Sequence, residues 1–245
     1  MFESTLPFGT PDLIRASAFE RYLEESVRSA DGDGLSSRLS TLSPSLAEDL
    51  MRFEHARRPG DGLEVLEVLA ACVRHARSLL IHLRDDNRVI PLTVYPYERL
   101  IHCPVRMDQL LAGRLTDLQV LHIEPAVLRP LGDPDSALVD APEFYAPLDP
   151  LLWELALRGA RGDLLPEIAG VATYRVTPGA DLDGLDLVGT LAAAVQRLRL
   201  QTTPLREIAG WPGFDHDRST RMLNGLYLQS ALIVSRSHPG AVSGL

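Results

Sequence analysis

Three histidines stand in similar apolar surroundings and are the residues of this sequence best suited to chemistry. His82, His102 and His122 each fall in or at the end of a short apolar run that is long enough for one strand. If these strands were neighbours, the imidazoles would converge near Cys103 or Glu124, as a three-histidine metal site requires. One hypothesis is therefore a metal-dependent enzyme. The other is that these are hydrogen-bonded core residues, because alternation places His82 and His122 on faces shared with apolar side chains.

The remaining residues indicate no second reaction centre. Cys103 directly follows His102, and neighbours on a strand point to opposite faces, so the two are poorly placed for nucleophilic catalysis. All 24 basic residues are arginine, which excludes Schiff-base chemistry and a P-loop lysine. The sequence also contains no glycine-rich phosphate loop, G-x-S-x-G, H-E-x-x-H or EF-hand motif. We therefore expect a non-enzymatic protein with no cofactor.

An aromatic and proline cluster, Tyr95-Pro96-Tyr97, marks the end of a predicted strand. Exposed tyrosine is common at protein interfaces, so Tyr95 and Tyr97 are candidates for an interaction surface. A buried corner of the sheet would instead place both residues inside. The sequence leaves both interpretations open.

Charge is distributed unevenly along the chain, whose net charge is −9. Residues 1–186 hold 30 acidic residues and 18 arginines, a balance of −12, whereas residues 187–245 hold three acidic residues and six arginines, a balance of +3. An acidic body disfavours contact with phosphate groups. Only the C-terminal part would favour binding to nucleic acid.

Apolar periodicity and turn residues predict the elements that position these side chains. Helices are expected at 10–30, 43–57, 63–75, 104–115 and 151–157, and strands at 78–84, 88–95, 99–103, 118–123 and 170–176. The first two strands form an expected hairpin, in which Pro91 predicts an edge strand or a bulge. Residues 124–150 are rich in proline and form the expected boundary between two domains.

The C-terminal stretch has the most readable pattern. An amphipathic helix at 187–200, a short helix at 205–209, a helix capped by Asp215 that runs to about 230, and a strand at 232–235 follow one another. This order, over about 186–236, resembles a winged helix-turn-helix.

The resemblance implies that the helix after Asp215 is a recognition helix. Arg218, Ser219, Thr220 and Arg221 would then contact the major groove of DNA and its phosphates. The other interpretation is a small helical domain that serves packing or contact with protein.

The expected fold class is α+β. N-terminal helices with a small, mostly antiparallel sheet would form residues 1–150, and a winged-helix-like helical domain would form residues 151–245. Cys72 and Cys103 are expected to be reduced and buried, because the N-terminus shows no secretory signal. No apolar run is long enough for a membrane span, so we expect a cytoplasmic protein without membrane contact.

The leading functional hypothesis is a regulatory or adaptor protein that acts through protein–protein contacts, with another protein or a second copy of itself. A DNA-binding transcriptional regulator that uses the C-terminal domain is the alternative. The second alternative is the metal-dependent enzyme that uses His82, His102 and His122.

Overall fold

The computed structural model describes residues 13–29, 42–55 and 64–236. The chain divides into two compact units, Met1–Leu148 (unit 1) and Asp149–Leu245 (unit 2), each described by itself below. Both units combine helices with an antiparallel sheet, so the expected mixed α+β class is confirmed. The expected helix starts at residues 10 and 63 lie outside the described residues. None of the described helices has the length and apolar character needed to cross a membrane.

Unit 1 is built around a five-stranded antiparallel sheet with the order β4-β1-β2-β3-β5. Its strands are β1 (Leu79–Asp85), β2 (Arg88–Tyr95), β3 (Leu100–His102), β4 (Gln119–Pro125) and β5 (Tyr145–Pro147). The hairpin of β1 and β2 is confirmed, and Asp86 adopts φ 51° in its turn.

The position of Pro91 differs from the expectation, because β2 is a central strand and not an edge strand. β3 pairs only with Thr93 to Tyr95 of β2. At Pro91 no described strand therefore pairs with β2 on its β3 side, so the missing N–H interrupts no ladder among the described residues.

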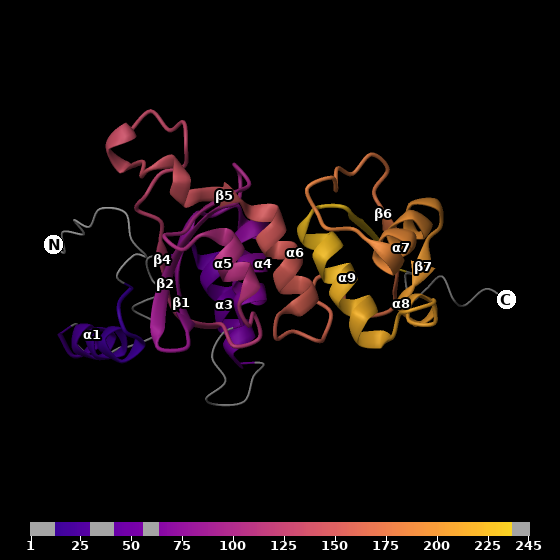
Figure 1. Cartoon of the computed structure of the whole chain (residues 1–245). Helices are drawn as coiled ribbons and strands as arrows, with labels where there is room; N and C mark the ends of the chain where they lie inside the picture. Colours follow the sequence, from indigo (N-terminus) through magenta and orange to yellow (C-terminus); the bar gives the residue numbers. More distant parts are fainter. Residues whose placement is uncertain (1–12, 30–41, 56–63, 237–245) are drawn as a thin grey trace. The chain divides into compact units, whose positions relative to one another are not determined.

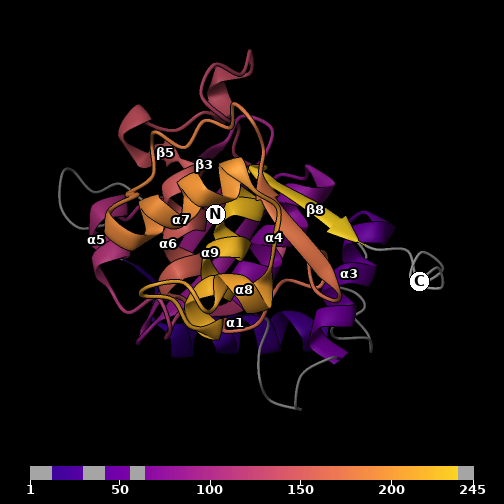
Figure 2. The ribbon, with the colours of Figure 1, turned by 90° about the vertical axis from the view of Figure 1, so that its right-hand side faces the viewer.

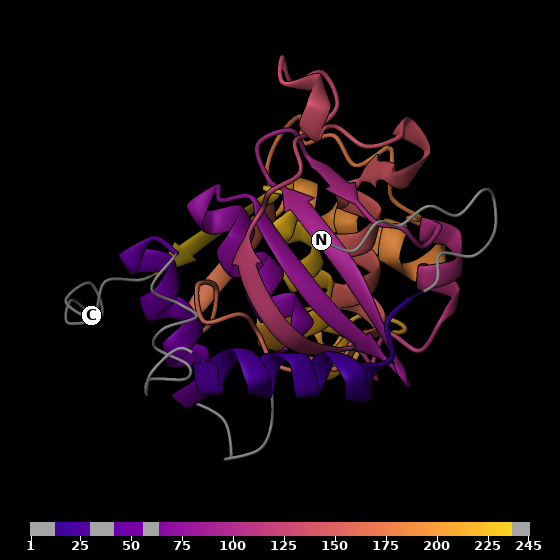
Figure 3. The same ribbon diagram turned by 90° about the vertical axis from the view of Figure 1, so that its left-hand side faces the viewer.

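Helices lie on both sides of the sheet of unit 1. Figure 1 shows α3 (Pro44–His55), α4 (Val65–His75) and α5 (Met107–Ala112) on one side. The strand residues Leu79, Ile81 and Leu83 are buried, and so is every residue of α4 from Val65 to Cys72. The other side carries α1 (Ala16–Ser29), which crosses the strands in Figure 3.

The helix α1 is attached to the hairpin by main-chain and side-chain contacts. The Ala16 N–H donates to the Asn87 carbonyl, and the Val89 N–H donates to the Ile14 carbonyl. Ala16, Phe19 and Val89 form a small core, against which Leu23 and Leu121 pack.

Residues 126–144 connect β4 to β5 and contain only two short 3-10 helices, Ser136–Leu138 and Pro142–Phe144. The sequence predicts a boundary connection over 124–150. The connection is shorter, because β5 pairs with β3 and a helix starts at Leu148.

Unit 2 contains α6 (Leu148–Arg158), α7 (Gly189–Leu200), α8 (Leu205–Ile208) and α9 (His216–Leu228). Its three-stranded antiparallel sheet has the order β7-β6-β8, formed by β6 (Ala172–Val176), β7 (Thr203–Pro204) and β8 (Leu232–Arg236). Figure 2 looks onto α7, α8, α9 and β8. The central strand, β6, precedes α7 in the sequence.

Candidate functional site

The helix α9 corresponds to the helix that the sequence predicts as a recognition helix, and eight of its 13 residues are buried. Its residues Met222, Leu223 and Leu226 have no exposed surface. α6 packs against it so closely that a Cβ atom at Gly225 would lie 2.7 Å from two ring carbons of Trp153. The helix therefore forms the core of unit 2.

The start of α9 is fixed by Asp215, as the sequence predicts. The Asp215 carboxylate accepts a hydrogen bond of 2.7 Å from the Arg218 N–H, which satisfies one of the free N–H groups of the first turn.

Two of the four residues predicted to contact DNA are inaccessible. Ser219 and Thr220 are 0% exposed. Their hydroxyls donate to the Asp215 carbonyl at 2.6 Å and to the His216 carbonyl at 2.8 Å, one turn earlier in the chain. The prediction of DNA contacts is wrong for these two residues, because their hydroxyls face the interior of the unit.

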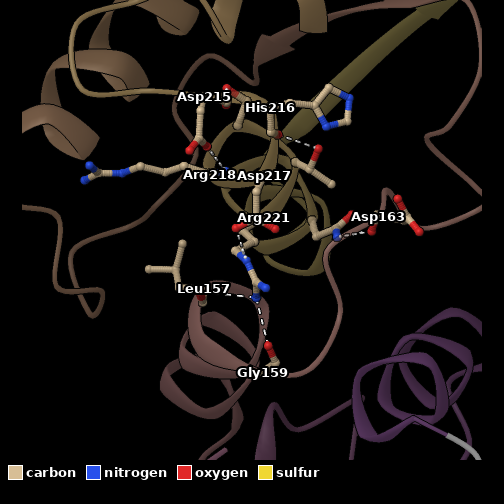
Figure 4. Close-up of polar contacts among 11 residues, drawn as sticks. Leu157, Gly159, Asp163, Asp215, His216, Asp217, Arg218 and Arg221 are labelled. Atoms are coloured by element: carbon tan, nitrogen blue, oxygen red, sulfur yellow. Dashed lines mark hydrogen bonds and ion pairs between the residues drawn. The ribbon is translucent and has the colours of Figure 1, made fainter. Parts of the chain in front are cut away.

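The arginines of the predicted site bind groups of their own unit (Figure 4). The Arg221 side chain is 19% exposed and pairs with Asp217 at 2.7 Å. It also donates to the carbonyls of Gly159 at 2.8 Å and Leu157 at 3.5 Å, at the C-terminal end of α6. Carbonyls at a helix end lack partners within the helix, so Arg221 caps α6.

Arg218 lies at the edge of the same region. Its Nη1 donates to the Gly213 carbonyl at 2.8 Å, and its guanidinium lies 5.1 Å from the centre of the Phe214 ring. The side chain therefore supports the turn before α9, and it is partly exposed with no ion pair to any residue that the structure describes.

The contacts of Asn224 were not predicted from the sequence. This side chain is 0% exposed, accepts from the Leu165 N–H at 2.9 Å and donates to the Asp163 carbonyl at 2.9 Å. An amide among the apolar residues of α9 was the available signal, since a buried amide needs partners. These two hydrogen bonds hold the connection after α6 against α9.

The three strand histidines do not converge. His82 and His122 are direct partners on β1 and β4, with ring centres 5.7 Å apart, but β2 separates His102 from them. Within the described ranges no group of three or more histidine, cysteine or acidic side chains is arranged to hold a metal ion. The hypothesis that His82, His102 and His122 form one metal site is therefore wrong, because β2 lies between the strand of His82 and that of His102.

The histidine pair lies under α1. The Phe19 ring centre is 4.6 Å from that of His82, and His82 Nε2 lies 3.9 Å from a Glu124 carboxylate oxygen. His82 Nδ1 is buried and has no hydrogen-bond partner among the described residues. Burial, with a further contribution from His122, lowers the pKa of His82 to about 4, and burial also raises the pKa of Glu124.

Unit 1 is expected to lose stability as pH falls, because His82 is neutral in the folded state. Its pKa rises from about 4 to 6.5 on unfolding, so the unfolded chain binds the proton first. The contribution of His82 to the free energy of unfolding is full above pH 6.5 and is lower by about 2 kcal/mol at pH 5. Urea unfolding at about pH 7.5 and pH 5 measures this loss. The variant His82→Leu should lose about 2 kcal/mol less than the wild type over that range, and an equal loss in both would refute the assignment.

His102 belongs to a different cluster, which holds the 126–144 connection on the sheet. Its Nε2 lies 3.0 Å from an Asp140 carboxylate oxygen. The Tyr145 hydroxyl donates to the Arg129 carbonyl at 2.7 Å and accepts from the Asp140 N–H at 3.1 Å. These contacts fix the connection at both ends.

Tyr95 and Tyr97 have opposite environments. Tyr95 is 1% exposed, and its ring stacks on the Tyr145 ring with the two ring centres 6.2 Å apart. The proposal of Tyr95 as part of an interaction surface is therefore wrong. Tyr97 is 88% exposed in the turn between β2 and β3. Burial raises the pKa of Tyr95, and Tyr145 raises it further. The turn and the start of the 126–144 connection lie at the same end of the sheet, because Leu79 of β1 pairs with Val94 of β2 and with Pro125 of β4.

Both cysteines are free and buried, as expected for this sequence. Burial raises the pKa of Cys103 to about 11 and raises that of Cys72 further above its usual value. Neither sulfur is a ready nucleophile, because thiolates and not thiols react.

Comparison of the chain with protein-family models, with curated proteins and with solved structures gave no significant match.

Proposed function

We propose that this chain is a non-enzymatic regulatory or adaptor protein that binds another protein through the end of the unit 1 sheet. The observation that carries the proposal is Tyr97, a large amphipathic side chain left 88% exposed on an otherwise ordered turn. Tyrosine is enriched among the residues that dominate binding energy at protein interfaces.

Further exposed apolar residues lie at the same end of the sheet. Leu79 of β1 pairs with Val94 on one side and with Pro125 on the other, so β2 and β4 both leave the sheet there. Val127, just after β4, is 66% exposed, and Leu131 is 39% exposed. We call Tyr97, Val127 and Leu131 the Tyr97 surface.

The charges around the Tyr97 surface favour a protein partner over nucleic acid. Residues 126–147 hold four acidic residues, Asp133, Asp135, Asp140 and Glu143, and one arginine, Arg129. Phosphate groups would be repelled here, whereas a basic protein surface would be attracted.

The burial of α9 within unit 2 supports the same proposal. The elements α7, α8, α9 and β8 follow one another in the order expected for a winged-helix-like unit. We therefore keep the winged-helix-like unit as our interpretation of this region. In it β8 pairs with β6, which comes before α7, instead of with a later strand. Because α6 covers α9, we propose that this unit serves packing and protein contact and does not read DNA.

Tyr97→Ala is expected to weaken binding of the partner at least about tenfold, as loss of a central aromatic residue does. Its effect on the free energy of unfolding should stay within about 0.5 kcal/mol, because the side chain is exposed. The immobilised full chain and its variants would be exposed to extract of the cells that produce it, and the retained proteins quantified by mass spectrometry.

Val171→Ala is the matched control for this experiment, because Val171 is also 88% exposed but lies in unit 2. We expect a protein that the wild type and Val171→Ala retain equally and Tyr97→Ala does not. Identical sets of proteins on all three would contradict the proposal. Duplex DNA retained at low salt and released by Arg218→Ala would favour the DNA-binding alternative instead.

A further inference from the structure

The strand β8 forms an edge of the unit 2 sheet. The order β7-β6-β8 gives β8 one neighbour, and no strand of the described chain pairs with its outer side. An edge strand presents main-chain N–H and C=O groups that can pair with another chain, and proteins usually block such edges with proline, charge or short length.

The two edges of this sheet differ in that protection. β7 is two residues long and ends in Pro204. β8 is five residues long, contains no proline and carries its one charge, Arg236, at the last position. Ile233, the second residue of the strand, is 41% exposed.

The hydrogen bonds of the ladder show which groups of β8 face outwards. The Thr177 N–H donates to the Ala231 carbonyl at 2.8 Å, so residues 177 and 231 form a hydrogen-bonded pair. Hydrogen-bonded pairs alternate along an antiparallel ladder, so Ile233 and Ser235 also bond to β6. The N–H and C=O groups of Leu232, Val234 and Arg236 therefore point away from β6.

These outward groups are self-complementary about Val234. In an antiparallel pair of two β8 strands centred there, Val234 faces Val234 and Leu232 faces Arg236, which gives up to about six main-chain hydrogen bonds. No two like charges are directly opposed. A two-fold interface uses the same patch on both copies, and this strand satisfies that condition.

The charge of the two units also favours self-association through unit 2. Residues 149–245 hold 10 acidic residues and nine arginines, a balance of −1, whereas residues 1–148 hold 23 acidic residues and 15 arginines, a balance of −8. Two copies would repel each other least at unit 2.

We propose that two copies of this chain pair antiparallel through β8 and join their sheets into one six-stranded sheet. β8 belongs to unit 2 and the Tyr97 surface to unit 1, so the dimer and the partner-binding function can fail independently.

Sedimentation velocity of the full chain over a wide concentration range tests the proposal. We expect reversible dimers for the wild type and for Val234→Thr, which keeps the outward N–H. Val234→Pro removes that N–H and places a ring against the incoming strand, but the bonds of β8 to β6 do not use it. Its dimer dissociation constant should rise more than about tenfold. A wild type that stays monomeric at every concentration, or a dimer that Val234→Pro leaves unchanged, would overturn the proposal.

A cysteine at the symmetry centre tests the register without relying on proline. Directly opposed residues of a hydrogen-bonded pair have Cα atoms about 5.5 Å apart, which is within the range of a disulfide. Val234→Cys should therefore form a covalent dimer under mild oxidation. Ile233→Cys, which is more exposed but faces Ser235 of the second copy, should not. Equal cross-linking of both variants would contradict the register, and cross-linking of neither would contradict the pairing.

Discussion

Trp153→Ala is expected to lower the free energy of unfolding of unit 2 by about 3–5 kcal/mol, the range found when large aromatic residues are removed from a core. The Trp153 side chain is 1% exposed and fills the space that Gly225 leaves on α9. The remaining tryptophan, Trp211, lies in the same unit and reports urea unfolding by fluorescence.

A second substitution shows whether the loss arises at this contact. In the Trp153→Ala background, Gly225→Leu should restore about 1–2 kcal/mol, because its side chain fills part of the cavity. In the wild type the same change should destabilise the unit, since a Cβ atom there already overlaps the ring. If Trp153→Ala lowered the free energy of unfolding of unit 2 by less than about 1 kcal/mol, the tight packing of α6 on α9 would be disproved.

Asn224→Ala should destabilise unit 2 by about 2–4 kcal/mol, although the side chain is small. The change leaves the Leu165 N–H and the Asp163 carbonyl without the partners they have in the wild type. A buried polar group without a partner costs about 1–3 kcal/mol. The measurement is again urea unfolding followed by Trp211 fluorescence.

Gln201→Ala provides the comparison for Asn224→Ala, because Gln201 is an exposed residue at the end of α7. We expect a change within about 0.5 kcal/mol there. If both variants lowered the free energy of unfolding by similar small amounts, the Asn224 contacts would not hold the connection after α6.

Local patterns in the sequence predict much of the secondary structure. The β1–β2 hairpin follows from an apolar run and a β-branched run around Asp85-Asp86-Asn87, and Asp215 starts α9 as its side chain indicates. The expected helices at 43–57, 63–75, 104–115 and 151–157 correspond to α3 to α6 within the described residues. In each case the deciding interactions are close in sequence.

Features that depend on distant contacts were not predictable in this way. The sheet order places β2 between β1 and β3, which separates His102 from His82. β6 becomes the partner of β8 across more than fifty residues of sequence. The strand β5 is three residues long and exists because it pairs with β3. Periodicity carries no information on such pairings.

The candidate site shows the same division. Arg218, Ser219, Thr220 and Arg221 have suitable chemistry for DNA, but the covering of α9 by α6 depends on residues about sixty positions earlier. Tyr95 and Tyr97 are two residues apart, yet one is buried under Tyr145 and the other lies in the turn beyond the strand. The sequence indicates the residue types, and tertiary contacts decide which of them are available.

Photo-crosslinking in living cells tests the proposed protein contact most directly. The photoreactive analogue p-benzoylphenylalanine would replace Tyr97 in one strain and Val171 in another, since both positions are 88% exposed. After irradiation we expect a discrete covalent adduct with one other protein from position 97, and no such adduct from position 171. Absence of any adduct at position 97, or the same adducts from both positions, would contradict a specific protein contact at the Tyr97 surface.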